Sequence, residues 1–283
     1  MVIDLHTHTT RSDGTDSPTQ LVQRAAAVGV DVLGLTDHDT LDGWVEAQAA
    51  LSPGMTLVPG VEISAVWRGA GRRIGVHIIG YLPDPTDAAL SAALAGLRES
   101  RVRRGRIMVD RLVEAGYPIT WPQVRDLAAG GAVGRPHIAR ALVAASVVDG
   151  VSSAFGGLLN SASPYYVPKD DIPALQAVAL IGAAGGVSAL AHALARRRGA
   201  VISDANIAEL AAGGLAAVEV DHPDHSPEDR AHLAAVAADL GLIRLGSSDY
   251  HGANKPTPLA ACTTTPEAYA ALMARARHEA VRG

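Results

Sequence analysis

Val2-Ile3-Asp4-Leu5-His6-Thr7-His8 opens the chain with an apolar segment that runs directly into two histidines. The apolar residues before the first histidine are typical of a buried β-strand. His6 and His8 are two residues apart, and side chains with that spacing on a strand point to the same side. Asp13 follows in the turn Arg11-Ser12-Asp13-Gly14-Thr15, which brings a carboxylate back toward the same strand end. This stretch therefore predicts a strand that ends in a metal-chelating pair.

The same arrangement recurs along the chain. Further residues that can bind a metal lie in or just after other apolar segments, namely His38, Glu62, His77, His192, Asp249 and His251. An acid such as Glu62 inside an apolar strand is costly to bury unless it is paired or bound to a cation. With the first motif, the set comprises six histidines and three acids. Nine nitrogen and oxygen ligands exceed the needs of one divalent ion and fit two or three.

Short apolar segments alternate with alanine-rich helical ones, which indicates a mostly parallel α/β sheet, and the number of units suggests a closed barrel. We expect strands at 2–5, 32–35, 56–58, 61–65, 74–80, 186–190, 217–220 and 243–246. The middle of the chain departs from this alternation, with helical patterns at 88–114, 121–129 and 136–145. We therefore expect a barrel domain over 1–84 and 169–283 that carries a mainly helical insertion over 85–168. In such a barrel the strand ends converge on one face, where active sites are built.

Composition limits the class of protein. Of 283 residues, 48% are hydrophobic and 19% are charged, which excludes a disordered or highly charged scaffold. The single cysteine, Cys262, excludes a disulfide framework and a cysteine-based zinc site. A net charge of −5 argues against a nucleic-acid coat protein, although a local basic patch stays possible. The first residues lack a signal-peptide pattern and no long apolar segment is present, so we expect a cytoplasmic protein without a membrane partner.

The ordered motifs Asp4-Leu5-His6-Thr7-His8, Thr36-Asp37-His38, Gly60-Val61-Glu62 and Ser248-Asp249-Tyr250-His251, with Ser12-Asp13-Gly14, His77 and Ala191-His192, resemble those of the PHP (polymerase and histidinol phosphatase) family of metal-dependent phosphoesterases. The resemblance implies a distorted (β/α)7 barrel with a trinuclear metal centre. Within the family the chain is most similar to the branch of 3′,5′-nucleoside bisphosphate phosphatases and 5′–3′ exoribonucleases. Gly134-Arg135-Pro136-His137-Ile138-Ala139 is similar to a motif of that branch.

The resemblance also implies how the ligands divide. His6, His8, Glu62 and Asp249 would hold one metal; Asp13, His38 and His251 the second; and Glu62, His77 and His192 the third, with Glu62 bridging. Asp13 stands where some histidinol phosphatases have histidine, which favours a harder ion. We expect two to three divalent ions, with Mn²⁺ preferred and Fe²⁺ or Zn²⁺ as alternatives. Ala193 follows His192 where the family frequently has proline, a change without a clear chemical consequence.

Four further residues are candidates for substrate binding. Arg135 offers a planar fork for phosphate, with a surface charge at a helix start as the alternative. His137 is a candidate to donate a hydrogen bond or proton to the leaving oxygen. His222, with the nearby His225, either contacts substrate or belongs to a polar loop, and Lys255 is placed to neutralise a second phosphate. The basic helix from Arg98 to Arg111 is either solvated or draws in polyanions such as short RNA.

The expected function is that of a metal-dependent phosphoesterase in which a water activated by metal ions hydrolyses a phosphate monoester. The preferred substrate is the 3′-phosphate of a nucleoside 3′,5′-bisphosphate, and short 5′-phosphorylated RNA is a second candidate. Histidinol phosphate and a cyclic phosphate are alternatives within the enzyme class. A catalytically silent PHP binding module is the alternative of another class, and the complete set of nine ligands disfavours it. The oligomeric state is not predictable from this sequence.

Overall fold

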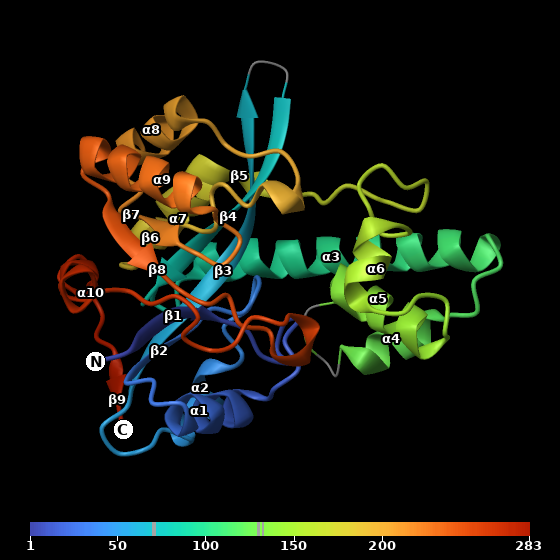
Figure 1. The fold of residues 1–283 in the computed structure, drawn as a ribbon, viewed down its shortest axis with the longest axis horizontal. Coiled ribbons are helices and arrows are strands. Elements are labelled where there is room, and N and C mark those ends of the chain that lie inside the picture. Colours follow the sequence, from blue (N-terminus) through green and yellow to red (C-terminus); the bar gives the residue numbers. More distant parts are fainter. Residues whose placement is uncertain (70–71, 129–130, 132) are drawn as a thin grey trace.

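The computed structural model describes residues 1–69, 72–128, 131 and 133–283. A curved sheet forms its centre, with helices outside the sheet and a helical lobe on one side (Figure 1). The strands are β1 (Ile3–Thr7), β2 (Val32–Leu35), β3 (Thr56–Gly69), β4 (Arg72–Tyr81), β5 (Ile172–Pro173), β6 (Val187–Leu190), β7 (Ala217–Asp221), β8 (Ile243–Gly246) and β9 (Val281–Arg282). The helices are α1 (Pro18–Ala27), α2 (Trp44–Ala49), α3 (Ala88–Glu114), α4 (Trp121–Leu127), α5 (Arg135–Ala144), α6 (Val151–Gly156), α7 (Ala174–Ala183), α8 (Asp204–Ala212), α9 (Pro227–Leu240) and α10 (Pro266–Met273), with 3₁₀ turns η1 (Arg196–Arg198) and η2 (Gly252–Asn254).

The sheet follows the order β1-β2-β3-β4-β6-β7-β8, and its two ends approach each other. Thr7, the last residue of β1, forms a parallel bridge with Tyr250 after β8, and the Thr264 N–H donates to the Ile3 carbonyl at 2.9 Å. Of the described strands on this path, β4 alone runs antiparallel to its neighbours. The predicted α/β class and distorted, mostly parallel seven-stranded barrel are therefore confirmed.

Two predicted strands, 56–58 and 61–65, are one strand in the structure, the fourteen-residue β3. The sequence suggested a break because Pro59 and Gly60 usually interrupt strands. Instead they mark a change of partner, since Pro59 pairs with Leu35 of β2 and Gly60 with Tyr81 of β4. The strand thus continues past the barrel rim as a long hairpin with β4.

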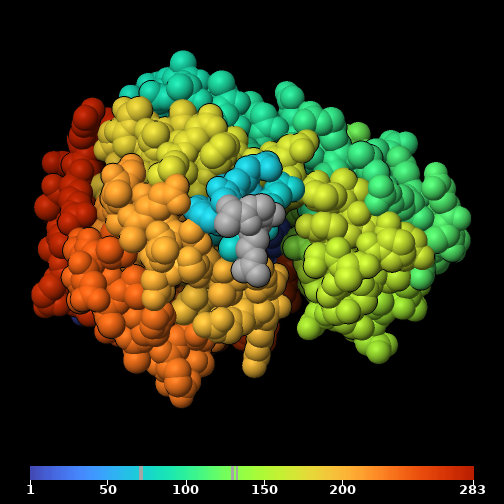
Figure 2. Space-filling model, turned by 90° about the horizontal axis from the view of Figure 1, so that it is seen from above, coloured from blue at the N-terminus to red at the C-terminus, as the bar shows by residue number. Residues whose placement is uncertain are grey.

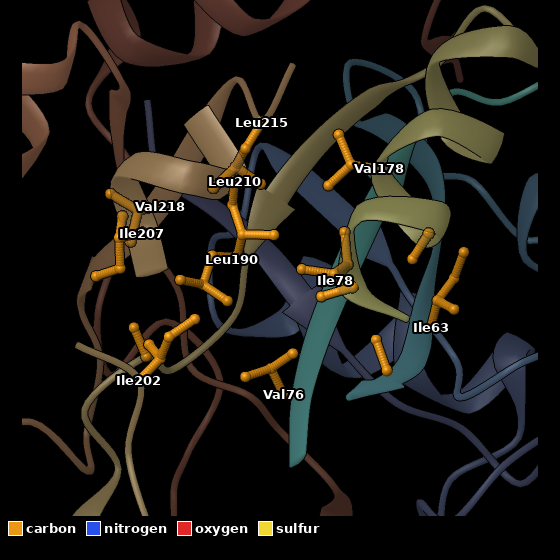
Figure 3. Close-up of a cluster of buried hydrophobic side chains, with 14 of the residues drawn as sticks. Ile63, Val76, Ile78, Val178, Leu190, Ile202, Ile207, Leu210, Leu215 and Val218 are labelled. Carbon is orange, nitrogen blue, oxygen red and sulfur yellow. The ribbon is translucent and has the colours of Figure 1, made fainter. Parts of the chain in front are cut away.

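One hydrophobic cluster joins the sheet to the helices that cover it. Figure 3 shows Ile63 and Ile78 of the β3–β4 hairpin packed near Leu190, Val178 and Leu210, which come from β6, α7 and α8. The first turns of α3 add Leu90, Leu94 and Leu97 to this cluster. Burial of these side chains fixes the sheet beneath the strand ends that carry the candidate ligands.

A second cluster belongs to the helical lobe. Met108, Val109 and Leu112 from the last turns of α3 pack against Ile138 and Leu142 of α5. α3 has 27 residues and so spans about 40 Å, and Figure 1 shows it running from the barrel into the lobe. One rigid helix therefore positions the lobe beside the barrel rim.

The two other predicted lobe helices are present with shifted ends. α4 ends at Leu127, and Ala129 of its predicted range lies outside the described residues. α5 begins at Arg135 and ends at Ala144, one residue earlier at each end than predicted. Among the described residues, none of the helices combines the length and hydropathy needed to cross a membrane.

Candidate metal centre

A tight loop after β1 folds back over the strand end. The N–H groups of Ser12 and Gly14 both donate to the Thr9 carbonyl, at 3.0 and 2.9 Å. Gly14 lies so close to the strand that a Cβ atom there would be 2.5 Å from the His8 carbonyl oxygen. This close approach brings Asp13 within 3.8 Å of the His8 ring. The predicted return of the Asp13 carboxylate toward β1 is present in the structure.

Glu62, on β3, lies at the middle of five histidines. Its Oε2 is 3.2 Å from His6 Nε2, 3.1 Å from His8 Nε2 and 3.0 Å from His38 Nδ1. Its Oε1 is 2.6 Å from His77 Nδ1 and 2.9 Å from His192 Nε2. Both carboxylate oxygens therefore face imidazole nitrogens from several different strands.

Two further acids, Asp249 and Asp13, complete the cluster. Asp249 Oδ1 is 3.5 Å from His6 Nε2, 3.4 Å from His8 Nε2 and 3.4 Å from His251 Nδ1. Asp13 is 3.3 Å from His251 Nε2 and 3.7 Å from His38 Nε2. All nine residues that the sequence nominated as ligands are thus brought together, and all except His77 are buried.

The donor atoms fit divalent cations. Among the described residues, the buried atoms Glu62 Oε2, Asp249 Oδ1 and His38 Nδ1 have no hydrogen-bond partner, which is costly unless a cation binds there. Three groups have donor atoms within 4.8 Å of one another: His8, Asp13, His38 and His251; His6, His8 and Asp249; and His38, Glu62 and His77. Metal–ligand bonds of about 2.1 Å place neighbouring ligand atoms at such separations.

These groups differ in detail from the division that the family resemblance implies. His8 joins the group of Asp13, and His38 takes the place of His192 beside Glu62 and His77. His38 holds this position because its Nδ1 faces Glu62 while its Nε2 faces Asp13. Burial lowers the pKa of His38 to about 3 and that of His251 to about 4, so both rings are neutral at pH 7. A neutral imidazole has the free lone pair that a metal requires.

The backbone is strained beside the cluster. His192 has φ of 31° and Asp249 has φ of 53°, in a region that residues with a Cβ rarely adopt. Such conformations cost of order 1–3 kcal/mol each and persist where the surrounding structure enforces them. Here this backbone conformation accompanies side chains that reach the cluster from the ends of β6 and β8.

Glu219 on β7 is a residue that the sequence interpretation missed. It is fully buried, and its Oε1 accepts from His6 Nδ1 at 2.8 Å and from the Ser247 hydroxyl. Its Oε2 accepts from the His192 N–H at 2.7 Å. Because Nδ1 of His6 donates to Glu219, Nε2 is the atom that faces the centre. Glu219 is an acid inside the apolar segment 217–220, and the same pattern in the sequence identified Glu62 as a candidate ligand.

Two cations share one oxygen of Asp249. Arg198 and Lys255 lie 2.6 and 2.7 Å from Asp249 Oδ2, and His222 Nε2 is 3.4 Å from the same atom. Burial alone would raise the pKa of Asp249, but Lys255 and Arg198 hold it well below its usual value. Lys255 and His222 therefore lie beside the centre, and their contact with substrate stays a prediction. Arg198 was missed, although a run of three arginines after the β6 motif was visible.

His225 has a different environment from His222. Its Nδ1 donates to the Val220 carbonyl at 2.9 Å, and its Nε2 accepts from the Leu194 N–H at 3.1 Å. Both ring nitrogens are occupied by backbone, so His225 joins the loops after β6 and β7. Of the two alternatives for His225, the structure favours the loop role.

The lobe presents Arg135 and His137 in the first turn of α5. The Gly134 N–H donates to His137 Nδ1 at 3.0 Å, so Nε2 carries the ring proton. Burial lowers the pKa of His137, which keeps the ring neutral. Arg135 donates to the Leu159 carbonyl at 3.1 Å, and its guanidinium lies 4.9 Å from the Phe155 ring. Arg135 is thus partly buried rather than a free surface charge.

The basic stretch of α3 divides between two faces. Arg101 and Arg104 are buried, and Arg98 donates to the Asp39 carbonyl at 2.8 Å, whereas Arg103 and Arg106 are exposed. The interpretation of this stretch as a solvated helix therefore holds for Arg103 and Arg106 but is wrong for Arg101 and Arg104. Arg98 and Arg101 both contact Asp39 of the barrel, because a helix places positions three apart on one side.

The chain is similar to known proteins over most of its length. The PHP domain family matches residues 4–95. The chain is 37% identical to a 5′-3′ exoribonuclease of Haemophilus influenzae over 251 residues, which cover 88% of this chain and 89% of the relative. It is 35% identical to a 3′,5′-nucleoside bisphosphate phosphatase of Chromobacterium violaceum over 256 residues, with 88% and 87% covered.

A solved structure from Bifidobacterium adolescentis, whose proposed activity is that of a metal-dependent phosphoesterase, superposes with a TM-score of 0.91. It is 36% identical in sequence, and the match covers 97% of this chain and 96% of that one. The likeness therefore extends through the barrel and the helical lobe together.

Proposed function

From the premise that this chain belongs to the PHP family, we propose that it is a metal-dependent phosphoesterase that hydrolyses phosphate esters of nucleotides. The observation that carries the proposal is the convergence of six histidines and three carboxylates with buried, unpartnered donor atoms. The names of the two relatives support nucleotide substrates. The complete ligand set argues against a silent binding module.

We assign the metal sites to the nine clustered residues, with Glu62 between the groups because its two oxygens face different histidines. Bound divalent ions supply Lewis acidity that makes water nucleophilic at neutral pH and neutralises phosphoryl oxygens. Mn²⁺ is our preferred ion, because imidazole and carboxylate ligands together with a second-site aspartate, Asp13, suit it.

The residues around the centre have separate tasks in this proposal. Arg198 and Lys255 keep Asp249 ionised and oriented, and they offer positive charge to a phosphate that arrives beside it. His137 donates from its protonated Nε2 to the leaving oxygen of the ester. Arg135 binds phosphate from the lobe. The helical segment over 85–168 is then a cap whose α3 and α5 form one wall of the substrate site.

The preferred substrate is a nucleoside 3′,5′-bisphosphate, hydrolysed at the 3′-phosphate, and short 5′-phosphorylated RNA is the second. The test is phosphate release by the Mn²⁺-loaded protein from a panel of adenosine 3′,5′-bisphosphate, AMP, histidinol phosphate, a ribose cyclic phosphate and a 5′-phosphorylated dinucleotide. We expect the bisphosphate to have the highest kcat/KM. Absence of release from every compound by protein that holds metal would establish the silent binding module instead.

The control for this panel is a pair of aspartate variants. Asp13→Asn removes a charged ligand candidate, whereas Asp42→Asn changes an exposed aspartate away from the cluster. We expect the first variant to lose both metal and activity and the second to keep them. Equal activity of the two variants would remove Asp13 from the centre.

A further inference from the structure

Two segments from opposite ends of the chain meet beside the metal centre. The first is the Asp13 loop, residues 8–16 after β1, and the second is residues 249–254 after β8. Each carries candidate ligands, His8 and Asp13 in the first and Asp249 and His251 in the second. The geometry of these ligands therefore depends on how the two segments are held against one another.

Tyr250 binds both ends of the Asp13 loop. Its carbonyl accepts from the His8 N–H at 2.9 Å, and its hydroxyl donates to Asp16 Oδ2 at 2.7 Å. Asp16 is only 6% exposed, so the second hydrogen bond is shielded from water. Tyr250 stands between the candidate ligands Asp249 and His251 in the sequence. Its two hydrogen bonds therefore join the backbone that carries these ligands to the Asp13 loop.

Asn254 and its neighbours hold the middle of the same loop. Asn254 Nδ2 donates to the Asp13 carbonyl at 2.6 Å, and the Ala253 N–H donates to the Thr15 hydroxyl at 2.9 Å. Gly252 has φ of 63°, and a Cβ atom there would overlap Thr15 Oγ1. A larger residue at this position would displace Thr15. Together with the two hydrogen bonds of Tyr250, these contacts form a clamp around Asp13.

The cap contacts a different part of the Asp13 loop. A Cβ atom on Gly131 would overlap the carbonyl oxygen of Thr10. Figure 2 shows a hollow between the barrel loops and the cap, with N-terminal residues in blue at its bottom. The cap and the clamp thus hold different residues of the loop, and the residues next to Asp13 are held by the clamp.

One group of candidate ligands is built mainly from the clamped segments. We call it the Asp13 group, and its members are His8, Asp13, His38 and His251. Three of these four residues lie in the two segments. Of the three groups whose donor atoms lie within 4.8 Å of one another, this one alone contains Asp13. The group of His38, Glu62 and His77 instead takes two of its three members from the β3–β4 hairpin. A change in the clamp at Asp13 should therefore affect the Asp13 group and leave the hairpin group in place.

We propose that Asn254 and Tyr250 are positioning residues that fix the Asp13 loop against the segment after β8 and thereby set the affinity of the Asp13 group for its metal ion. The inference rests on the proposed function, which takes the members of this group as metal ligands. Asn254 acts through the Asp13 backbone, and Tyr250 acts through Asp16. Because the clamp holds the ligands in place before metal arrives, less conformational freedom is lost on binding. Affinity for this ion is thus set separately from affinity for the ion at the hairpin group.

The experiment measures Mn²⁺ binding by titration of metal-free protein in the presence of a competing chelator. Asn254→Ala and Tyr250→Phe remove one hydrogen-bond donor each from the clamp. Asn206→Ala and Tyr269→Phe are the matched controls, because Asn206 bonds to Ser203 before α8 and Tyr269 lies on α10, both away from the centre. We expect one ion to bind about tenfold or more weakly in each test variant, as is typical when a partner of a metal ligand is lost. The ion at the hairpin group should keep its affinity, and the controls should bind every ion as the wild type does.

Two more measurements separate positioning from a general loss of structure. In metal-free protein, amide hydrogen exchange of residues 8–16 should be faster in both test variants, whereas exchange of β3 should match the wild type. Excess Mn²⁺ should restore kcat in both test variants, because every ligand is still present.

Wild-type affinity for every ion in both test variants, or unchanged exchange of residues 8–16, would overturn the clamp. Equal weakening of all ions, or lost activity that excess Mn²⁺ does not restore, would also overturn it. Wild-type protein that binds Mn²⁺ but releases phosphate from no compound of the panel would contradict the proposed function and leave the clamp standing.

Discussion

Glu219→Gln tests whether a residue that touches no substrate sets the properties of the centre. Glu219 accepts from three buried donors: His6 Nδ1, the Ser247 hydroxyl and the His192 N–H. Glutamine has one acceptor oxygen and a donor NH₂ group, so at least one of these donors then faces another donor. An unsatisfied buried group costs about 1–3 kcal/mol, which is the expected loss of stability.

The effect on metal binding is separate from that on stability. The carboxylate fixes the His6 tautomer and increases its basicity, and loss of such a partner typically weakens metal affinity by about 10- to 100-fold. The assay is competition for Mn²⁺ against a chelator, with thermal unfolding of the metal-free protein measured in parallel. Glu209→Gln is the matched control, because Glu209 accepts one hydrogen bond from Trp67 away from the centre. Wild-type Mn²⁺ affinity in a folded Glu219→Gln variant would refute the reasoning.

Three further outcomes are expected. Asp13→Ala should lower turnover by orders of magnitude in a protein that circular dichroism shows to be folded. Gly14→Ala should weaken metal binding, measured as bound metal per chain, because a Cβ there would be 2.5 Å from the His8 carbonyl. After metal removal, the melting temperature should fall as pH decreases from 6.5 to 4. Burial lowers the pKa values of His38 and His251 below that of a histidine in the unfolded chain. The unfolded chain therefore binds more protons than the folded protein in this pH range, which destabilises the folded protein.

The sequence was sufficient for the barrel and for the residues that converge at its rim, because both follow from local rules. Strand periodicity places His6 and His8 on one face, and parallel strands bring their ends to one rim. The β3–β4 hairpin was harder to predict. The local sequence at Pro59-Gly60 is compatible both with the end of a strand and with a strand that changes its pairing partner. The outcome depends on β4, which pairs with β3 from Gly60 onward.

The partners of the candidate ligands depend on contacts between distant parts of the chain. Arg198 donates to Asp249, which lies 51 residues later in the chain, and Glu219 accepts from His6, which lies 213 residues earlier. Sequence patterns mark such residues as unusual but do not pair them. The inward face of α3 has the same origin, since Arg101 is turned toward Asp39 by the packing of the first turns of that helix on the barrel.

Charge balance connects metal binding with phosphate binding. Without metal, Arg198 and Lys255 offset the charge of Asp249, whereas Glu62 and Asp13 face histidine side chains. Two or three divalent ions carry more positive charge than these three carboxylates carry negative charge, so metal binding leaves the centre cationic. Arg198 and Lys255 then lie beside an excess of positive charge that only an anion can relieve. Phosphate affinity at the centre should therefore increase with metal occupancy.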